Sequence, residues 1–289
     1  MTDIDLSSAH ARLRASNPLI QCITNTVVQQ FSANVLLAVG ASPAMLDHDA
    51  DAAQFAHLAG GLLVNFGTAT DQQFLAADAA VDAVDAVTED AKPWVLDPVS
   101  IGAADHRTTR IRRAAAAHPT AIRGNASEIA ALAGAGAGGR GVESTDEVDA
   151  VLPAAAELAR TTGAIVAVSG ARDAIVAHID GADHIARVDG GHSFMPLVIG
   201  TGCSLGAVTA AYLAAVPPAG TSSQAGPAGS AAFERFTAVV AAHAHFAVAG
   251  EAAATGALGP GTYSVHFLDA LFTTDDDRIG RARVEVTTV

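Results

Sequence analysis

The sequence predicts an α/β fold in which a mainly parallel β-sheet is covered by helices on both faces. Short apolar runs alternate along the chain with longer, alanine-rich segments, which is the order expected of strands and crossover helices. The runs are apolar almost throughout, as in strands buried on both faces. Half of the 289 residues are hydrophobic, enough for a sizeable core.

Five short apolar runs are expected to form the parallel strands. They are residues 20–24, 62–66, 94–97, 120–122 and 165–169. The segments long enough to be crossover helices are residues 26–39, 71–87, 107–117 and 144–161, with a short helix over residues 129–133. Together they predict strand–helix repeats that build one continuous sheet.

The second half of the chain begins with a hairpin and ends in helices. Residues 175–179 and 184–188 flank Asp180-Gly181, which is a turn signal, so they are expected to pair antiparallel. Residues 203–216, 231–254 and 261–271 are predicted helices, and residues 283–286 a last strand. Residues 133–142 and 217–229 are predicted loops, and neither resembles an interdomain linker. We therefore expect one domain over residues 1–289.

Composition and charge narrow the partners. The net charge of −14 disfavours nucleic acid and anionic membranes, which are bound through clustered Lys and Arg. Residues 194–216 carry no charge and are long enough to span a bilayer, but Pro196 and the glycines near residue 200 break the stretch, which favours a buried loop and core helix. The acidic start lacks the features of a signal peptide, and the two cysteines are too few for a disulfide framework. A cytoplasmic location fits these observations.

The sharpest motif is Gly200-Thr201-Gly202-Cys203, directly before an apolar helix. Glycines let a backbone approach a ligand closely, and the amides at a helix N-terminus can bind an anion such as a phosphate. The alternative is a simple helix entry turn with Cys203 as a small buried residue. The Walker pattern of P-loop enzymes does not occur in the chain.

Polar residues follow two of the predicted strands. Asp97 ends one of them, at the edge where parallel sheets bind ligands, although an Asp before proline can also simply start a turn. Arg123 follows the next strand, and Asn125 with Glu128 fits a capping box at a helix start. The functional alternative places Arg123 near phosphates and Glu128 near a Mg²⁺ ion.

Other polar residues have structural interpretations when taken alone. Asn25 fits an ordinary helix N-cap, and Met45 fits a core position. His243 and His245 are two residues apart on a predicted helix, so they face different sides and do not form a metal-binding pair.

Taken together, these stretches resemble the hydroxyethylthiazole kinases. Seven motifs occur in the order seen in that family: residues 18–25 (PLIQCITN), 40–45 (GASPAM), 65–68 (NFGT), 96–99 (LDPV), 123–128 (RGNASE), 168–170 (VSG) and 200–203 (GTGC). The match extends from about residue 17 into the C-terminal helices. Each motif is weak by itself, and the combination is specific.

The resemblance implies a ribokinase-like, three-layer α/β/α fold and transfer of the ATP γ-phosphate to the hydroxyethyl group of a thiazole. It implies a thiazole pocket containing Met45 and Gly200, with Asn25 and Gly67 nearby. The implied ATP-binding residues are Arg123, Ser169, Thr201 and Gly202. The implied Mg²⁺ residues are Asp97 and Glu128. Family members are similar in forming trimers with active sites between subunits, so a homotrimer is expected.

Cys203 stands where related sugar kinases carry an aspartate base. A thiol near pKa 8.5 can act as a weak base, and a helix N-terminus would lower that pKa, whereas an approaching triphosphate would raise it. Cys203 is therefore expected to position the substrate and is a possible base.

Three rival functions share the fold: another small-alcohol kinase acting on a hydroxymethylpyrimidine or a sugar, an ATP-dependent dehydratase that repairs hydrated nicotinamide cofactors, and a sensor without turnover.

Overall fold

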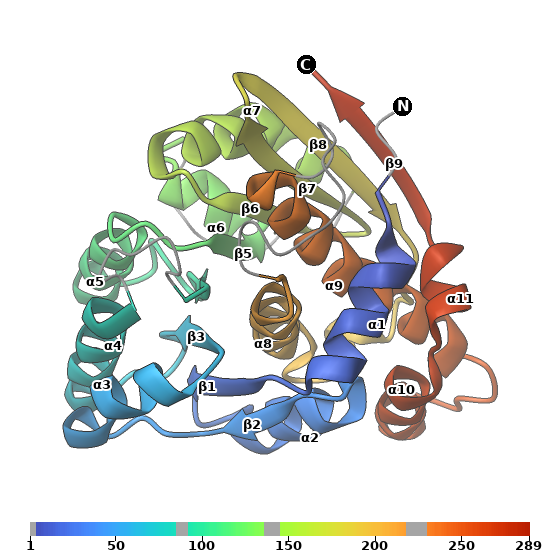
Figure 1. The fold of residues 1–289 in the computed structure, drawn as a ribbon, viewed down its shortest axis with the longest axis horizontal. Coiled ribbons are helices and arrows are strands. Elements are labelled where there is room, and N and C mark those ends of the chain that lie inside the picture. Colours follow the sequence, from blue (N-terminus) through green and yellow to red (C-terminus); the bar gives the residue numbers. More distant parts are fainter. Residues whose placement is uncertain (1–3, 85–91, 136–144, 218–229) are drawn as a thin grey trace.

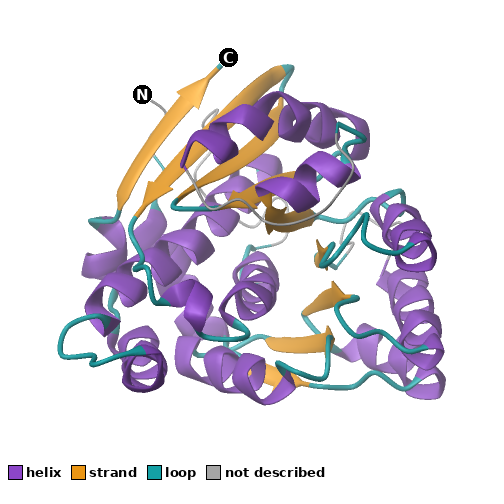
Figure 2. Ribbon diagram, turned by 180° about the vertical axis from the view of Figure 1, so that it is seen from behind, coloured by secondary structure: helices purple, strands orange, loops and turns teal. Residues whose placement is uncertain are grey.

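One nine-stranded sheet runs through the molecule between two layers of helices (Figures 1 and 2). The computed structural model describes residues 4–84, 92–135, 145–217 and 230–289. The strand order is β2-β1-β3-β4-β5-β6-β7-β8-β9. The strands are β1 (Leu19–Ile23), β2 (Ser42–Ala44), β3 (Gly61–Asn65), β4 (Trp94–Asp97), β5 (Ala121–Asn125), β6 (Ile165–Ser169), β7 (Arg172–Ile179), β8 (Ala182–Asp189) and β9 (Arg283–Thr288).

The sheet is parallel from β2 to β6 and antiparallel from β6 to β9. This confirms the mainly parallel sheet and the hairpin at Asp180-Gly181, where both turn residues have positive φ. The sequence did not predict β2, because Ser42-Pro43-Ala44 is three residues long and lacks an apolar run. Pro43 is tolerated because β2 is an edge strand.

Each face of the sheet has its own core. Within β3, Leu62 and Val64 pack on one side and Leu63 on the other, as the two-residue period of a strand requires. The face of Leu63 is covered by α1 (Leu6–Ser16), α2 (Gln29–Val39), α8 (Thr201–Ala214), α9 (Ala231–Ala253), α10 (Pro260–Thr273) and α11 (Asp276–Gly280). The other face is covered by α3 (Asp49–Leu58), α4 (Asp71–Val84), α5 (Asp105–Ala115), α6 (Ala126–Leu132) and α7 (Thr145–Thr162).

The predicted helices form with shifted ends. α2 begins at Gln29 rather than at residue 26, because residues 26–28 form a turn in which Val28 N donates to Asn25 O at 3.3 Å. α1 was not predicted, although Leu6, Ala9, His10 and Leu13 are buried at helical spacing. The segments expected to be loops, residues 133–142 and 217–229, lie mostly outside the described residues.

The apolar C-terminal helices are core helices. α8 is almost entirely buried, which confirms the interpretation of residues 194–216 as a loop and a core helix. By length and hydropathy alone α9 could cross a membrane, but 78% of its most apolar stretch is buried inside the fold.

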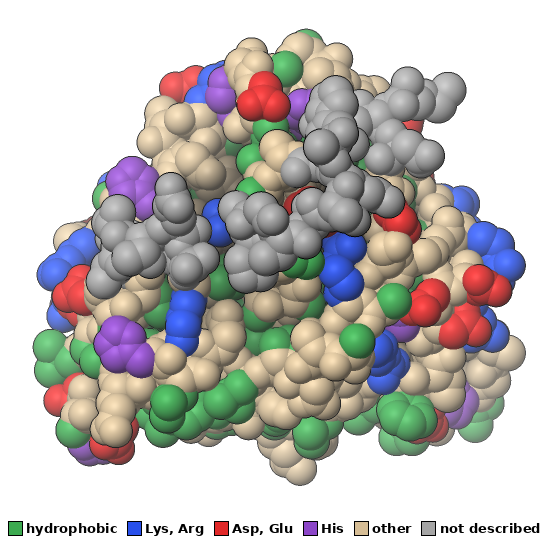
Figure 3. All heavy atoms as spheres, in the orientation of Figure 1, with side chains coloured by type: hydrophobic (Ala, Val, Ile, Leu, Met, Phe, Trp, Pro, Cys, Tyr) green, Lys and Arg blue, Asp and Glu red, His purple; other side chains and the backbone are tan. Residues whose placement is uncertain are grey.

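On the face in Figure 3, basic and acidic side chains are both scattered over the surface, leaving aside the grey residues.

The strand order reverses direction beside β1. The chain leaves β1 toward β2 on one side and later enters β3 on the other, so α2 and α3 lie on opposite faces. Ligands of open α/β sheets bind outside the carboxyl ends of the strands at such a switch point. The carboxyl ends of β1 and β3 are thus the first place to search for a site.

Candidate active site

A chain of polar side chains follows the carboxyl edge of the parallel strands. Asn25 lies two residues after β1, Asn65 ends β3 and Asp97 ends β4. Arg123 lies near the end of β5, and Ser169 ends β6. Four of these side chains are buried, and contacts between neighbours join all five. A continuous row of linked polar side chains at the carboxyl ends of the largely apolar parallel strands identifies the candidate site.

Asn65 is the centre of this row and was not among the predicted site residues. Its Oδ1 accepts hydrogen bonds from Asn25 Nδ2 at 3.1 Å and from Gly67 N at 2.9 Å. Its Nδ2 donates to Asp97 Oδ2 at 2.9 Å, because the parallel register sets Asn65 directly beside Asp97. Asn65 therefore connects the predicted substrate residues to the predicted metal residue. A polar residue that ends an apolar strand was the available signal.

Asp97 is completely buried and incompletely paired. Arg123 Nη1 lies 3.8 Å from its Oδ2, and its Oδ1 has no hydrogen-bond partner among the described residues. Burial, and to a lesser extent the charge of Glu128, raise the pKa of this carboxyl to about 7 against the opposing effects of Arg123 and Asn65. An orphaned, buried carboxylate oxygen costs free energy unless a cation or a proton satisfies it. The donor set therefore suits a hard cation such as Mg²⁺.

Glu128 forms the capping box that its spacing predicted. Its Oε2 accepts from Asn125 N at 2.9 Å, while Asn125 Oδ1 accepts from Glu128 N at the same distance. Its Oε1 accepts from Ser100 N at 3.2 Å, which ties α6 to the turn after β4. The capping role is thus confirmed. The role of Glu128 in metal binding stays a prediction. The capping role and the metal role are compatible, because the charge of Glu128 still acts on Asp97.

The predicted ATP residues meet at the N-terminus of α8. Arg123 Nε donates to Ser169 Oγ at 3.1 Å. A Cβ on Gly202 would lie 3.0 Å from Arg123 Nη1, so a glycine lets the helix start approach the guanidinium. The Thr201 hydroxyl instead lies within hydrogen-bond distance of Met195 O and Val198 O. Its side chain thus holds the preceding turn.

The start of α8 leaves two backbone amides without a described carbonyl partner. The first amides of a helix have no intrahelical partner, and no described carbonyl accepts from Gly202 N or Cys203 N. Gly200, at φ +99°, is the N-cap, and a Cβ there would lie 2.9 Å from Phe31 Cδ1 and 3.2 Å from Val28 Cγ1. Only glycine fits this turn against α2. The positive end of the helix dipole therefore faces the polar row.

Cys203 closes the substrate side of the site. Asn25 Nδ2 donates to its Sγ at 3.4 Å, and a Cβ on Gly67 would lie 3.0 Å from Asn25 Cβ and Nδ2. The structure therefore brings Asn25, Gly67 and Cys203 together. Met45 lies just beyond β2, half-buried against the core beside β1, and no described hydrogen bond or glycine contact links it to the other three.

The Cys203 thiol is less acidic than expected. Burial raises its pKa and the charge of Asp97 adds to the effect, while Asn65, Arg123 and Asn25 only partly oppose it. A lowered pKa, as expected from the helix N-terminus, is therefore not found in the free protein, where the net shift is upward and burial is its largest cause. At neutral pH the group is a thiol, which can donate or accept weak hydrogen bonds but is a poor base.

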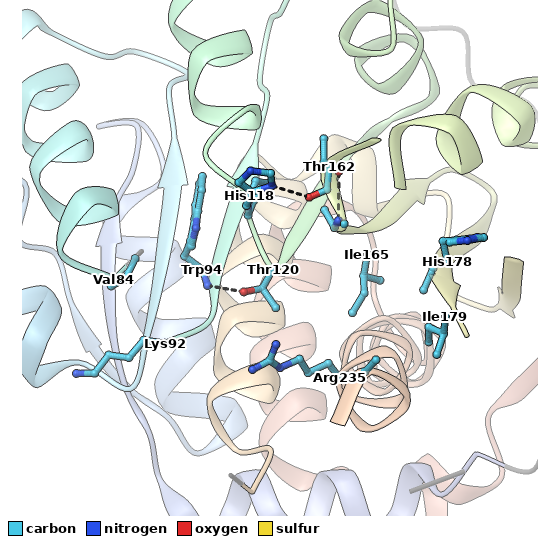
Figure 4. Close-up of a pocket in the computed structure, with 15 residues that line it drawn as sticks. Val84, Lys92, Trp94, His118, Thr120, Thr162, Ile165, His178, Ile179 and Arg235 are labelled. Carbon is cyan, nitrogen blue, oxygen red and sulfur yellow. Dashed lines mark hydrogen bonds between the residues drawn. The ribbon is translucent and has the colours of Figure 1, made fainter. Parts of the chain in front are cut away.

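A separate cavity of about 460 Å³ lies at the opposite edge of the sheet (Figure 4). Its lining includes Trp94, Thr120 and Ile165, which stand at the amino ends of β4, β5 and β6, and Arg235 of α9. The polar residues of the candidate site, Asp97, Arg123 and Ser169, lie at the carboxyl ends of the same three strands.

Among the described residues there is also no group of three or more His, Cys, Asp or Glu that could hold a metal. A cation would thus need additional ligands such as phosphate oxygens and water.

Comparison with known proteins identifies the family. The family model "Hydroxyethylthiazole kinase family" matches residues 10–277. The chain belongs to the hydroxyethylthiazole kinase family. It is 48% identical over 267 residues to the hydroxyethylthiazole kinase of Corynebacterium efficiens, covering 92% of each chain. The resemblance in the seven motifs is thereby confirmed, and the chain is a kinase.

Solved structures agree on the fold of this hydroxyethylthiazole kinase family member. The hydroxyethylthiazole kinase protein of Pyrococcus horikoshii superposes with a TM-score of 0.80 at 30% identity, covering 98% of each chain. The pyridoxal kinase of Staphylococcus aureus, solved with AMP-PCP and pyridoxal, reaches a TM-score of 0.58 at 15% identity over 94% of this chain and 98% of that one. The latter shows the fold alone. Both confirm the predicted ribokinase-like, three-layer fold.

Proposed function

We propose that this protein transfers the γ-phosphate of ATP to the hydroxyethyl group of 4-methyl-5-(2-hydroxyethyl)thiazole, a step of thiamine biosynthesis or salvage. The observation that carries this proposal is the buried row from Cys203 and Asn25, through Asn65 and Asp97, to Arg123. It places groups suited to an alcohol at one end and groups suited to a triphosphate at the other. The family supplies the identity of the alcohol.

The substrate side suits a small neutral ring. Asn25 contributes one amide side chain, Gly67 leaves room for that side chain, and the Gly200 turn brings Val28 and Phe31 close to the helix start. We assign the thiazole to the space bordered by these residues and Met45, whose thioether can contact an aromatic ring. An uncharged heteroaromatic alcohol needs few polar partners, which fits this sparse set.

The nucleotide side suits a triphosphate. The guanidinium of Arg123 lies against Gly202, next to the amides of Gly202 and Cys203, and we assign the transferred phosphoryl group to this place. Fixed donors aimed at that position lower the barrier without reorganising during the reaction. We assign Ser169 to the same side because it orients Arg123, and Thr201 because its hydroxyl fixes the turn that precedes these amides.

Asp97 and Glu128 would hold Mg²⁺ together with phosphate oxygens. The unpaired Oδ1 of Asp97 is the observation that favours the ion here. The metal would neutralise phosphate charge. The amides, Arg123 and the cation would neutralise the phosphate charge. The remaining task for Cys203, whose Sγ is oriented by the hydrogen bond that it accepts from Asn25 Nδ2, is to contact the alcohol. We therefore propose positioning as its main role.

We further propose a homotrimer whose active sites lie between subunits. Val27, Leu197 and Ile199 lie beside the candidate site and are 62%, 61% and 70% exposed, although they are large and apolar. Apolar side chains gathered next to a ligand site favour a subunit contact there.

We also propose that residues 1–289 act as a single domain in the cytoplasm, supported by the 98% coverage of the Pyrococcus chain and by the absence of a disulfide among the described residues.

A substrate panel tests the proposed activity. ADP release is measured with the thiazole alcohol, with a hydroxymethylpyrimidine, with a sugar and with hydrated NADH. The proposal predicts the highest kcat/KM for the thiazole alcohol by a wide margin. Preference for the pyrimidine or the sugar would reassign the kinase, turnover with hydrated NADH would indicate a dehydratase, and nucleotide binding without turnover would indicate a sensor.

A further inference from the structure

A buried histidine and a partly exposed aspartate form a pair next to the nucleotide side of the site. His243 of α9 is fully buried, and its Nδ1 is 2.6 Å from Asp173 Oδ2 at the start of β7. Its Nε2 has no partner among the described residues. The pair is thus the one described polar contact of this histidine. A buried polar group costs free energy unless it is paired. Because Nε2 of His243 has no described partner, the burial of this histidine calls for an explanation.

Asp173 also holds the turn between β6 and β7. Its Oδ1 accepts a hydrogen bond from Gly170 N at 2.9 Å. A carboxylate only accepts, so Nδ1 of His243 carries the proton that it shares with Asp173. A Cβ on Gly170 would lie 2.4 Å from Val148 Cγ2, so this turn is pressed against α7 on its other side. The turn is therefore held by α9 through Asp173 and His243, and by α7 through packing.

The turn carries the residue that orients Arg123. Ser169 immediately precedes Gly170, and its Oγ accepts from Arg123 Nε at 3.1 Å. Arg123 in turn lies against Gly202 and 3.8 Å from Asp97 Oδ2. Hydrogen bonds therefore connect His243 to the guanidinium through Asp173, Gly170 and Ser169, with one peptide bond between the last two. A shift of the turn would move the Ser169 hydroxyl and release the Arg123 side chain.

We propose that Asp173 and His243 are positioning residues for nucleotide binding: they fix the β6–β7 turn so that Ser169 holds Arg123 toward the phosphates. This inference rests on the proposed kinase function, because it assigns Arg123 to ATP. It predicts an effect on the nucleotide and none on the thiazole alcohol, whose assigned residues lie at the other end of the row. A merely structural role of His243 would lower stability without this selectivity.

The test compares variants of His243 with a matched control on the same helix. His243→Leu removes the donor, and His243→Asn keeps an N–H near the position of Nδ1. His245→Leu is the control, because His245 is equally buried but is paired with Tyr212 OH and Leu271 O, away from the site. Melting temperature, KM for MgATP, KM for the thiazole alcohol and binding of ADP are measured for each.

We expect His243→Leu to raise KM for MgATP and the Kd for ADP by roughly ten-fold, since a hydrogen bond to a charged group is lost. KM for the thiazole alcohol stays within about two-fold of the wild type, as expected for a site that the variant does not touch. His243→Asn restores most of the nucleotide affinity. His245→Leu lowers the melting temperature and leaves both KM values unchanged. If His243→Leu does not fold, Asp173→Asn replaces it, because it keeps an oxygen for Gly170 N but weakens the pair.

A double variant tests the route through Ser169. If His243 acts through the turn, combining His243→Leu with Ser169→Ala has no larger effect on nucleotide affinity than the stronger single change. Additive effects would overturn the route, and an unchanged affinity for ADP in folded His243→Leu would overturn the inference. Failure of the proposed function is a separate result, because it would appear in the wild type as absence of nucleotide binding or of thiazole phosphorylation.

Discussion

Asn65 offers the sharpest perturbation of the candidate site. Asn65→Asp keeps the oxygen that accepts from Asn25 Nδ2 and Gly67 N, but it replaces the N–H that donates to Asp97 Oδ2 at 2.9 Å with a second carboxylate oxygen. Loss of a hydrogen bond to a charged group costs about 1.5–3 kcal/mol. If this is lost from the transition state, kcat/KM falls by about ten- to a hundred-fold.

The same variant should gain an unusual pH dependence. Two carboxylates about 3 Å apart cannot both ionise readily, so the pair retains one proton to a higher pH than an isolated carboxyl. A shared proton restores a donor between residues 65 and 97. The Asn65→Asp protein should therefore recover part of its activity as the pH falls, whereas the wild type should not. The measurement is kcat/KM between pH 5.5 and pH 8.5.

The control is Asn17→Asp, which adds the same charge at an exposed position where the one described hydrogen bond of the Asn17 side chain is accepted from Ser42 Oγ. It should change neither kcat/KM nor its pH profile. Asn65→Leu removes all three hydrogen bonds and is expected to lower stability by roughly 3–5 kcal/mol, so its melting temperature reports on the row as a structural element. A folded Asn65→Asp protein with wild-type kcat/KM at every pH would refute the central role of Asn65.

Four further predictions concern single features. Cys203→Ala should lower turnover, by less than the roughly 10²–10⁴-fold that a general base contributes; unchanged rate and pH profile would exclude a base role, and complete inactivity would show that the thiol is essential. Glu128→Gln should lower kcat and raise the Mg²⁺ requirement while the cap and the melting temperature persist, and normal kinetics at low Mg²⁺ would leave only capping. Burial lowers the pKa of His10, and it lowers the pKa of His245 to about 3. Both histidines therefore take up protons on unfolding, and the urea midpoint should fall as the pH drops below about 6.5, the pKa of an unfolded histidine. A midpoint independent of pH between 7.5 and 5 would contradict this. Light scattering should give a trimer, and mixing Met45→Arg with Glu128→Gln after gentle dissociation should restore activity; mixed trimers without activity would place both residues in one subunit's site.

The sequence predicts the fold well because the fold follows from local patterns. Continuous apolar runs marked β1, β3, β4, β5 and β6, and the Asp180-Gly181 turn marked the hairpin. Four elements escaped for physical reasons. β2 and α11 are only three and five residues long, too short to show a pattern, and α1 and α3 carry few large apolar side chains.

The contacts of the site could not be predicted in the same way. Asp97 and Arg123 were chosen by their places at strand ends and Ser169 by the family resemblance, and the structure does bring the three together. Asn65 was missed because its importance comes from the register that sets it beside Asp97, which no local pattern contains. The Cys203 pKa was misjudged for a related reason, since burial depends on what the rest of the chain places around the thiol.

Phosphorylation of the thiazole alcohol tests the central claim most directly. Purified protein is incubated with MgATP and 4-methyl-5-(2-hydroxyethyl)thiazole, and the product is weighed by mass spectrometry and its phosphorus located by NMR. We predict one added phosphoryl group on the hydroxyethyl oxygen, formed with an equal amount of ADP and absent in the Asn65→Leu protein. ATP hydrolysis without a phosphorylated thiazole, or phosphate on another substrate in preference to this one, would contradict the account.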